Sequence, residues 1–213
     1  MYPKILHFIQ NLEKEFETIP DSRKKLLQNI SRYIAEKLSH KKPIQLMYVC
    51  THNSRRSHLG QIWAKVAADY YNINNVSSYS GGTEITSFNI NAINALKRLG
   101  FIIKTITDDK NPEYEVSYAN QFSPSLCFSK LFSDKKNPQK EFAAIMTCSD
   151  AEENCPFISG VELRVATTYH DPKNFDNTPL QDQMYDERCK QIALETFFVF
   201  SLLKTKQFEF NKY

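Results

Sequence analysis

Apolar residues change their spacing at about residue 43, and this change separates two kinds of predicted structure. Before it they recur every three or four residues, the spacing of helices with one buried face. One stripe holds Ile5, Phe8, Ile9, Leu12 and Phe16, and a second holds Leu26, Leu27, Ile30, Ile34 and Leu38. Pro20-Asp21-Ser22 between them offers a turn and a helix N-cap. Residues 1–42 are therefore predicted to form a helical hairpin, which either packs on the rest of the protein or provides a dimerisation surface.

Residues 43–213 are predicted to form one domain in which strands alternate with helices. The strand-like apolar runs are 44–49, 76–80, 142–147 and 164–169. Helical patterns follow the first run as far as about Tyr71, reach from Asn89 to Leu99, and close the domain around residues 192–203. Strands separated by helices favour an α/β fold with a parallel sheet covered on both faces. Residues 110–141, rich in Asn, Pro, Ser, Lys and Asp, are predicted to be an insertion with little regular structure.

Composition narrows the function classes. The 213 residues, 41% of them hydrophobic, suffice for one domain with its own core. A net charge of +3 argues against a dedicated nucleic-acid binder but allows a local anion site. No apolar run approaches the roughly 20 residues that span a bilayer, and the N-terminus has no signal-peptide core. We therefore expect a soluble, cytoplasmic protein that contacts neither nucleic acid nor membrane.

The five cysteines, at positions 50, 127, 148, 155 and 189, are expected to be free or catalytic thiols in that compartment. No pair has zinc-ligand spacing with a nearby histidine, so neither a structural metal nor a required cofactor is expected. Cys127 and Cys189 are predicted to be incidental.

The segment Cys50-Thr-His-Asn-Ser-Arg-Arg-Ser57 carries the strongest chemical signal. It joins a predicted strand to a predicted helix, where successive backbone N–H groups can line one anion-binding concavity. Cys50 is then placed as a nucleophile, Arg56 can hold two oxygens of a tetrahedral anion, and Ser57 can donate to the thiolate or a leaving sulfur. The rest of the predicted oxyanion cradle is Thr51, His52, Asn53, Ser54 and Arg55. The alternative is that Cys50 is a small buried core residue.

Two further signals fall at the same predicted sheet edge, where ligands bind in such folds. Asp171-Pro172 follows the fourth strand on a stiff loop, so its carboxyl can donate a proton to a leaving oxygen, although Asp-Pro is usually only a turn. Cys148 and Cys155 follow the third strand. A helix would separate them by about 10 Å along its axis, beyond the reach of a disulfide, so pairing requires this segment to unwind. Two buried thiols at the ends of one turn are the alternative.

Taken in order, these three signals resemble the low-molecular-weight phosphotyrosine phosphatase superfamily, and within it the thioredoxin-coupled arsenate reductases. The similarity covers about residues 44–109 and 142–205. It implies a four-stranded parallel sheet, with Cys50 as nucleophile, Arg56 as oxyanion clamp and Asp171 as general acid. It also implies that Cys148 attacks the Cys50–arsenic adduct and that Cys155 then forms a Cys148–Cys155 disulfide for thioredoxin.

The resemblance also implies a possible monovalent cation, because Asn53, Ser80 and Asp109 match its ligand positions, although Gln61 stands where the family has glutamate. The loop has His52 in place of the usual glycine and Arg55 in place of a second cysteine. Lys173 stands where eukaryotic-type phosphatases have a tyrosine.

Three functions therefore stay open at this point. They are arsenate reduction through Cys50, Cys148 and Cys155, hydrolysis of phosphate monoesters through a Cys50 phosphoenzyme, and non-catalytic oxyanion binding. The reduced protein is predicted to be at least partly helical over 149–154, with Cys148 near the Cys50 loop and Cys155 too far for a relaxed bridge.

Overall fold

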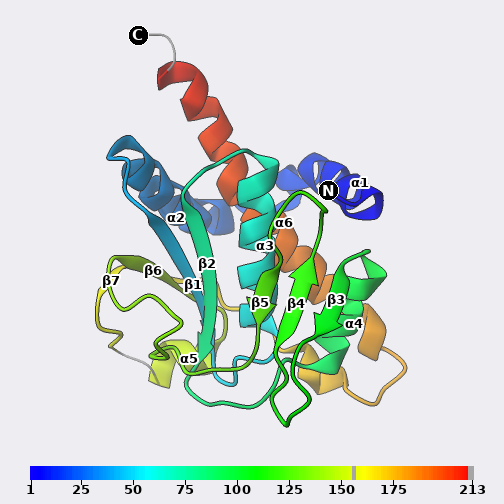
Figure 1. Cartoon of the computed structure of the whole chain (residues 1–213). Coiled ribbons are helices and arrows are strands. Elements are labelled where there is room, and N and C mark those ends of the chain that lie inside the picture. The colour runs from blue at the N-terminus through cyan, green and yellow to red at the C-terminus, as the bar shows by residue number, and fades with distance from the viewer. Residues whose placement is uncertain (155–156, 211–213) are drawn as a thin grey trace.

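The computed structural model describes residues 1–154 and 157–210, and its centre is a four-stranded parallel sheet (Figure 1). The strands run in the order β2-β1-β6-β7, as β2 (Val76–Gly82), β1 (Ile44–Cys50), β6 (Phe142–Met146) and β7 (Val161–Ala166). All three pairings are parallel, so the carboxyl ends of the strands share one edge. The predicted α/β fold with a four-stranded parallel sheet is confirmed.

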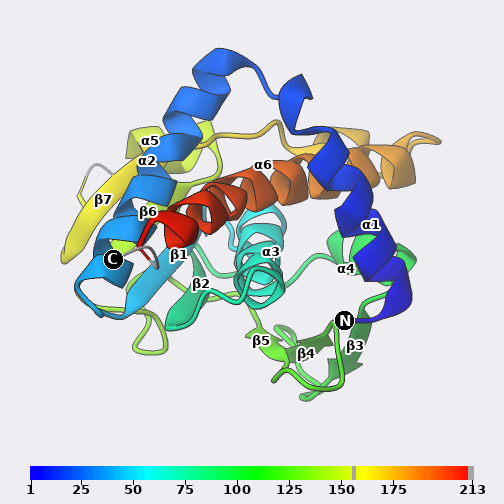
Figure 2. The same cartoon turned by 90° about the horizontal axis from the view of Figure 1, so that it is seen from above.

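Alternate side chains of β1 enter two separate clusters of buried residues. Leu46 and Tyr48 join the larger core, and Met47 and Val49 join a smaller one on the opposite face. On the larger side, α2 (Asp21–Ser39) and α3 (Arg56–Tyr70) pack on the sheet, and α6 (Gln181–Phe210) packs across them (Figure 2). The short α5 (Ser149–Asn154) contacts β1 and β6 and contributes Ala151 to the smaller cluster. Helices therefore cover both faces of the sheet, with three helices on one face and, in the described part of the chain, only the short α5 on the other.

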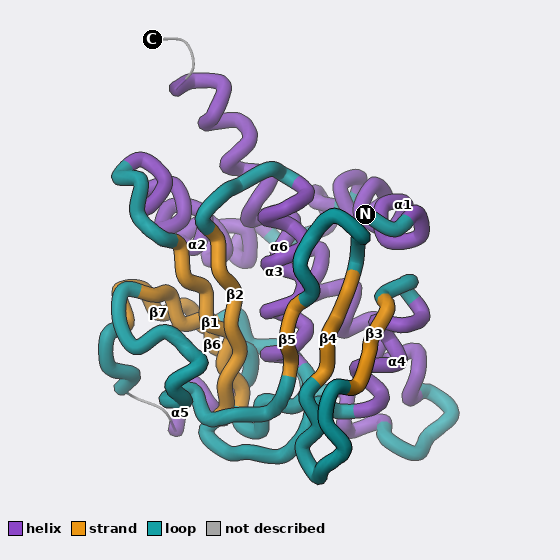
Figure 3. The backbone as a smooth tube through the Cα atoms, viewed as in Figure 1, coloured by secondary structure: helices purple, strands orange, loops and turns teal. Residues whose placement is uncertain are grey.

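The prediction of little regular structure in residues 110–141 is wrong in part. A second sheet forms from β3 (Ile102–Thr105), β4 (Tyr114–Ser117) and β5 (Ser125–Cys127), all antiparallel (Figure 3). These strands have four, four and three residues, too few to show a clear period-two pattern among the surrounding Asn, Pro and Ser. Pairing with neighbours, not local sequence, gives them their structure.

The N-terminal hairpin is present as α1 (Pro3–Lys14), a short 3-10 turn η1 (Phe16–Thr18) and α2. Its buried side chains, among them Ile5, Ile9 and Leu27, belong to the same core as the sheet and α3. The Phe8 ring lies 5.5 Å from the Trp63 ring, centroid to centroid. The hairpin therefore completes the core.

The remaining elements are α4 (Ile90–Arg98), which packs on α6, and the 3-10 turn η2 (Pro172–Phe175). Across residues 1–154 and 157–210, no helix combines the length and the apolar character needed to cross a bilayer.

Candidate active site

Cys50 is the last residue of β1, and the loop after it turns directly into α3, which begins at Arg56. The thiol is almost fully buried, at 3% exposure. The loop backbone rests on the end of β2, where a Cβ at Gly82 would lie 2.7 Å from the Asn53 backbone nitrogen. Glu84 N–H also donates to the Thr51 carbonyl over 2.8 Å. The predicted strand–loop–helix junction is confirmed, and a glycine with no side chain lets it form.

A directed chain of hydrogen bonds ends on the Cys50 sulfur. The Lys130 backbone N–H donates to Asn53 Oδ1 over 2.9 Å, which fixes the orientation of the Asn53 amide. Asn53 Nδ2 therefore donates to Ser57 Oγ over 2.8 Å. Because Ser57 Oγ already accepts this bond, its own hydrogen is free to point at Cys50 Sγ, 3.1 Å away. This geometry suits stabilisation of a thiolate at Cys50.

Arg56 is held at one edge of its guanidinium by the segment after β7. Nη1 donates to the Tyr169 carbonyl over 2.7 Å, and Nη2 pairs with Asp171 Oδ2 at 2.6 Å. The Arg56 Nε is buried and has no hydrogen-bond partner among the described residues. The guanidinium has five N–H donors, so Nε and the second Nη2 hydrogen remain for two oxygens of an anion.

The fourth strand covers 161–166 and not 164–169 as predicted. Its pairing with β6 starts at Val161 and shifts by one residue at a bulge, which the apolar run alone does not indicate. Beyond β7 the chain stays beside β6, because Tyr169 N–H donates to the Thr147 carbonyl over 3.0 Å. Asp171 then accepts from Lys173 N–H over 3.0 Å and begins η2. The carboxyl is thereby placed beside Arg56.

Cys148 lies at the Cys50 loop, as predicted. Its sulfur is 3.4 Å from Thr51 Oγ1 and accepts the Ala151 N–H, also over 3.4 Å. It is 1% exposed and shares the smaller buried cluster with Cys50. The prediction of helix over 149–154 is confirmed by α5. Cys155 lies outside the described residues, so its predicted distance and pairing stay predictions.

The other cradle residues have mixed surroundings. His52 lies 3.3 Å from Glu84, and Ser54 Oγ donates to the Ser87 carbonyl over 2.7 Å. Arg55 donates through Nε to the Tyr185 hydroxyl over 2.8 Å, with Nη2 3.5 Å from Asp176. Burial raises the pKa of Tyr185 to about 12, so the hydroxyl keeps its proton and donates it to Asp176. Arg55 is therefore engaged away from the cradle.

The three side chains that match the family's monovalent cation ligands are each hydrogen-bonded within the chain. Asn53 Oδ1 accepts the Lys130 N–H, and Ser80 Oγ is bonded to His58 Nδ1 at 3.1 Å. Asp109 is exposed and accepts the Asn111 N–H. The described part of the chain also holds no group of three or more His, Cys, Asp or Glu side chains arranged for a metal ion.

Sequence reasoning missed the contacts that position the site from a distance. Arg23 of α2 donates to the Thr167 carbonyl. It also donates to Glu195 over 2.8 Å, and the Tyr169 hydroxyl donates to Glu195 over 2.7 Å. The sequence does offer one signal for Glu195, because a charged residue on the apolar face of the last helix needs a buried partner. Cys127 and Cys189 are buried, and burial raises the pKa of each to about 12, which agrees with their predicted incidental role.

Known proteins similar to this chain include arsenate reductases by sequence and a phosphatase by structure. No family model matches the chain, but an arsenate reductase of Staphylococcus aureus (strain Newman) is 30% identical over 153 residues, covering 71% of this chain and 94% of the relative. Arsenate reductase 2 of Staphylococcus haemolyticus is 27% identical over 114 residues, covering 53% of this chain and 66% of that protein. The crystal structure of a low-molecular-weight phosphotyrosine phosphatase from Vibrio cholerae O395 matches with a TM-score of 0.50 and 14% identity, over 77% of this chain and 97% of that one, which supports the fold.

A buried cysteine at the strand–loop–helix junction of this sheet agrees with a phosphatase-like family of enzymes that depend on cysteine. The chain belongs to the low-molecular-weight phosphotyrosine phosphatase superfamily, and its relatives by sequence are arsenate reductases. Because these relatives and structural neighbours are enzymes, non-catalytic oxyanion binding is set aside.

Proposed function

We propose that the protein is an arsenate reductase that works through a thiol cascade. One observation carries the proposal: Cys148 Sγ lies 3.4 Å from the hydroxyl of Thr51, the residue that follows Cys50. A phosphatase cycle uses one thiol, whereas a reductase needs a second thiol beside the first. The relatives named arsenate reductase support the same choice.

The first step binds and attaches the oxyanion. Arsenate enters the loop 51–56, where backbone N–H groups and the free Arg56 Nε–H donate hydrogen bonds to its oxygens. The Cys50 thiolate, stabilised by Ser57, attacks arsenic(V) and displaces one oxygen as water. Asp171 supplies a proton to that oxygen: the bound anion replaces the Asp171 carboxylate on Arg56, and the carboxyl takes up a proton from solvent beside the new negative charge before donating it. The product is a covalent Cys50–arsenic adduct.

The second step transfers two electrons. The Cys148 thiolate attacks Cys50 Sγ, forming a Cys50–Cys148 disulfide and breaking the sulfur–arsenic bond. The electron pair of that bond stays on arsenic, which leaves as arsenite. Arsenic is thereby reduced from +5 to +3, while two thiols are oxidised to one disulfide.

The third step frees the nucleophile. Cys155 attacks Cys148, forming a Cys148–Cys155 disulfide and releasing the Cys50 thiolate. A dithiol protein of the thioredoxin class then reduces this disulfide. In our proposal α5 unwinds to let the two residues meet, since a helix holds positions seven apart about 10 Å apart along its axis.

Hydrolysis of phosphate monoesters is the second candidate, and the Arg56–Asp171 pair favours it, because a clamp beside a proton donor suits an ester leaving group as well. Cys50 would form a phosphoenzyme that water hydrolyses, and Cys148 would not react. Lys173 after Pro172 offers no aromatic surface for a phosphotyrosine ring.

The deciding experiment measures NADPH consumption with arsenate, thioredoxin and thioredoxin reductase. The wild-type protein should turn over repeatedly, and Cys50→Ser, Cys148→Ala and Cys155→Ala should each stop turnover. Cys127→Ala is the matched control, because this thiol is buried away from the loop, and it should retain turnover.

Hydrolysis of an aryl phosphate is measured in parallel. Arsenate-dependent turnover that survives both Cys148→Ala and Cys155→Ala rules out the cascade. No arsenate turnover, together with robust aryl phosphatase activity that needs Cys50 alone, establishes the second candidate instead.

A further inference from the structure

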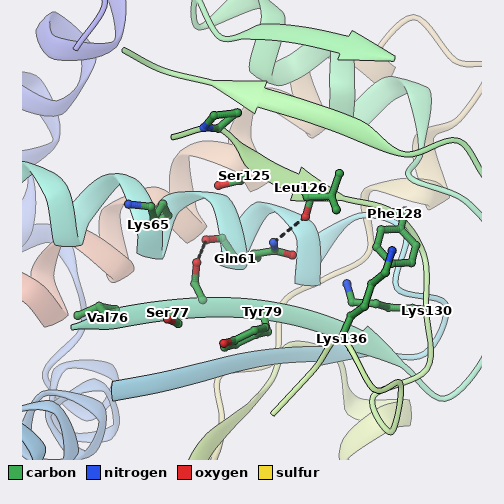
Figure 4. Close-up of a pocket in the computed structure, with 12 residues that line it drawn as sticks. Gln61, Lys65, Val76, Ser77, Tyr79, Ser125, Leu126, Phe128, Lys130 and Lys136 are labelled. Atoms are coloured by element: carbon green, nitrogen blue, oxygen red, sulfur yellow. Dashed lines mark hydrogen bonds between the residues drawn. The ribbon is translucent and has the colours of Figure 1, made fainter. Parts of the chain in front are cut away.

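A pocket of about 320 Å³ lies between β2, the side of α3 and residues 124–136 (Figure 4). In the described part of the chain, Cys50, Arg56, Cys148 and Asp171 are not among the residues that line it. The pocket is therefore separate from the proposed catalytic centre, and three features of its wall indicate what it binds.

The first feature is a buried acceptor that lacks a donor. Gln61 of α3 is only 6% exposed, and its Nε2 donates to the Leu126 carbonyl over 3.1 Å. Because a carbonyl can only accept, the amide cannot be flipped, and Gln61 Oε1 is left without a partner among the described residues. Figure 4 shows this oxygen on the side of the amide away from the Leu126 bond. A buried acceptor of this kind is normally satisfied by a donor, and here that donor must be a water molecule or a ligand group in the pocket.

The second feature is a pair of ammonium groups on one aromatic ring. Lys130 Nζ and Lys136 Nζ lie 4.5 and 4.4 Å from the centroid of the Phe128 ring. Lys136 is paired with Glu113 at 2.9 Å. Lys130 is 4% exposed, and no carboxylate of the described residues lies within 4 Å of its Nζ. Burial lowers the pKa of Lys130 and the nearby Lys136 charge lowers it further, while Cys127, Asp134 and Glu113 act in the opposite direction. The two ammonium groups therefore have one directly bonded carboxylate between them, and a bound anion would offset the remaining positive charge.

The third feature is a link from the pocket to the nucleophile. The Lys130 backbone N–H donates to Asn53 Oδ1, which begins the chain through Ser57 to Cys50. The Lys130 carbonyl accepts the Gly82 N–H over 2.9 Å at the end of β2. A ligand that moves Lys130 therefore acts on the hydrogen bond to the Cys50 sulfur.

We propose that this pocket is a second, regulatory oxyanion site, which takes a small tetrahedral anion that still carries one hydroxyl, such as hydrogen phosphate. Charged oxygens of the anion accept from Lys130 and Lys136. The hydroxyl donates to Gln61 Oε1, which gives the buried acceptor the donor that it lacks. Through Lys130 and Asn53, occupation of the pocket changes the reactivity of Cys50. The proposal concerns this pocket alone and holds for either candidate function.

Binding is tested with inorganic phosphate on the Arg56→Ala protein, in which the catalytic loop has lost its clamp. Calorimetry should show one site, and Lys130→Met or Lys136→Met should weaken it at least tenfold. Lys104→Met is the matched control, because Lys104 is exposed on β3 outside the pocket, and it should leave the affinity unchanged. Equal affinity in the Arg56→Ala protein and in its three lysine variants overturns the proposal. So does the absence of binding at about 10 mM phosphate, a concentration that would occupy even a weak anion site.

The link to the nucleophile is tested by the rate at which iodoacetamide alkylates Cys50 in the same Arg56→Ala protein. Phosphate should change this rate at least threefold, and Lys136→Met should abolish the change. Lys136→Met is the safer variant for this measurement, because the Lys136 side chain is 48% exposed. We expect the variant to keep its fold, which circular dichroism checks. A rate that phosphate does not alter, or alters equally in Lys136→Met, refutes the regulatory link.

Discussion

Asn53 is the most constrained residue of the catalytic loop. It must adopt a positive φ, and its side chain must both accept and donate a hydrogen bond. Its φ of 43° lies in the left-handed region, which asparagine tolerates better than most residues. Its amide accepts from Lys130 and donates to Ser57, and it is fully buried. No other residue type meets these requirements together: glycine lacks the amide, and aspartate lacks the donor.

Replacing Asn53 should therefore slow the chemistry of Cys50. In Asn53→Ala the Ser57 hydroxyl loses the donor that orients it, and alkylation of Cys50 by iodoacetamide should slow about fivefold, corresponding to ~1 kcal/mol for one hydrogen bond. Asn53→Gly serves as the control for backbone strain, since glycine adopts positive φ freely. Both variants should be slow, and a glycine variant as reactive as the wild type would assign the effect to the backbone instead.

At the scale of elements, the segment from β7 to η2 is held by α2, which lies far away in the sequence, and by α6, which follows η2. Arg23 on α2 and Glu195 on α6 form a 2.8 Å ion pair with side-chain exposures of 18% and 5%. The Arg23 guanidinium lies 5.0 Å from the centre of the Tyr169 ring, and Glu195 accepts the Tyr169 hydroxyl. The hairpin thus helps to position the segment from which Asp171 reaches Arg56.

Breaking this pair should destabilise the fold and weaken the site. Arg23→Met leaves the buried Glu195 carboxylate without its ion-pair partner, so the free energy of unfolding should fall by about 2–4 kcal/mol. Urea denaturation measures this change, and the turnover number should fall with it. Lys25→Met, an exposed neighbour on α2, should change stability by less than about 0.5 kcal/mol. A loss of equal size in both variants would contradict a specific role for Arg23.

The elements that could be predicted from the sequence are those that a local run of residues determines. The first and third strands were predicted to within one residue, because β1 and β6 are buried on both faces and stand out as apolar runs. The position of Cys148 followed, since neighbouring parallel strands end at one edge. The contact from Arg23 to Thr167 joins residues 144 apart, and the Lys130 bond to Asn53 joins residues 77 apart. No local pattern encodes such pairings.

At the scale of the whole molecule, the hairpin and the sheet share one core, so the hairpin should not be dispensable. Deleting residues 1–42 would expose part of the larger core around Trp63 and Phe197. Both side chains are fully buried in the intact protein. The shortened protein should bind a hydrophobic dye and lose the sharp aromatic signals of near-ultraviolet circular dichroism. A cooperative transition with an unchanged midpoint would show that residues 43–213 fold alone.

Stability of the whole molecule should also fall in mild acid, because of His58. Burial lowers the pKa of His58 well below its usual value, and the charge of Lys130 adds to this effect. The unfolded chain takes up a proton at this position below about pH 6.5, whereas the folded protein does not. The unfolded state then binds more protons, so the free energy of unfolding falls as pH drops below about 6.5, by up to about 1.4 kcal/mol per unit, and this contribution is constant above it.

The measurement compares the wild-type protein with His58→Asn, whose amide can replace the His58 bond to Ser80. Unfolding free energies from pH 7.5 to 5.0 should fall less steeply in the variant. Carboxyl groups contribute equally to both proteins, so the difference in slope reports His58. Parallel curves would contradict the assignment.

The adjacency of β1 and β6 has a consequence for how a second thiol can reach the first. Val49 is paired with Met146 in the ladder, so the chain delivers Cys50 and Cys148 to the same edge from neighbouring strands. Their effective concentration is set by the rigid sheet and not by closure of a loop. In the proposed cascade, the sheet itself therefore brings the second thiol to the first, and only the third thiol, Cys155, has to be brought in by a change of backbone.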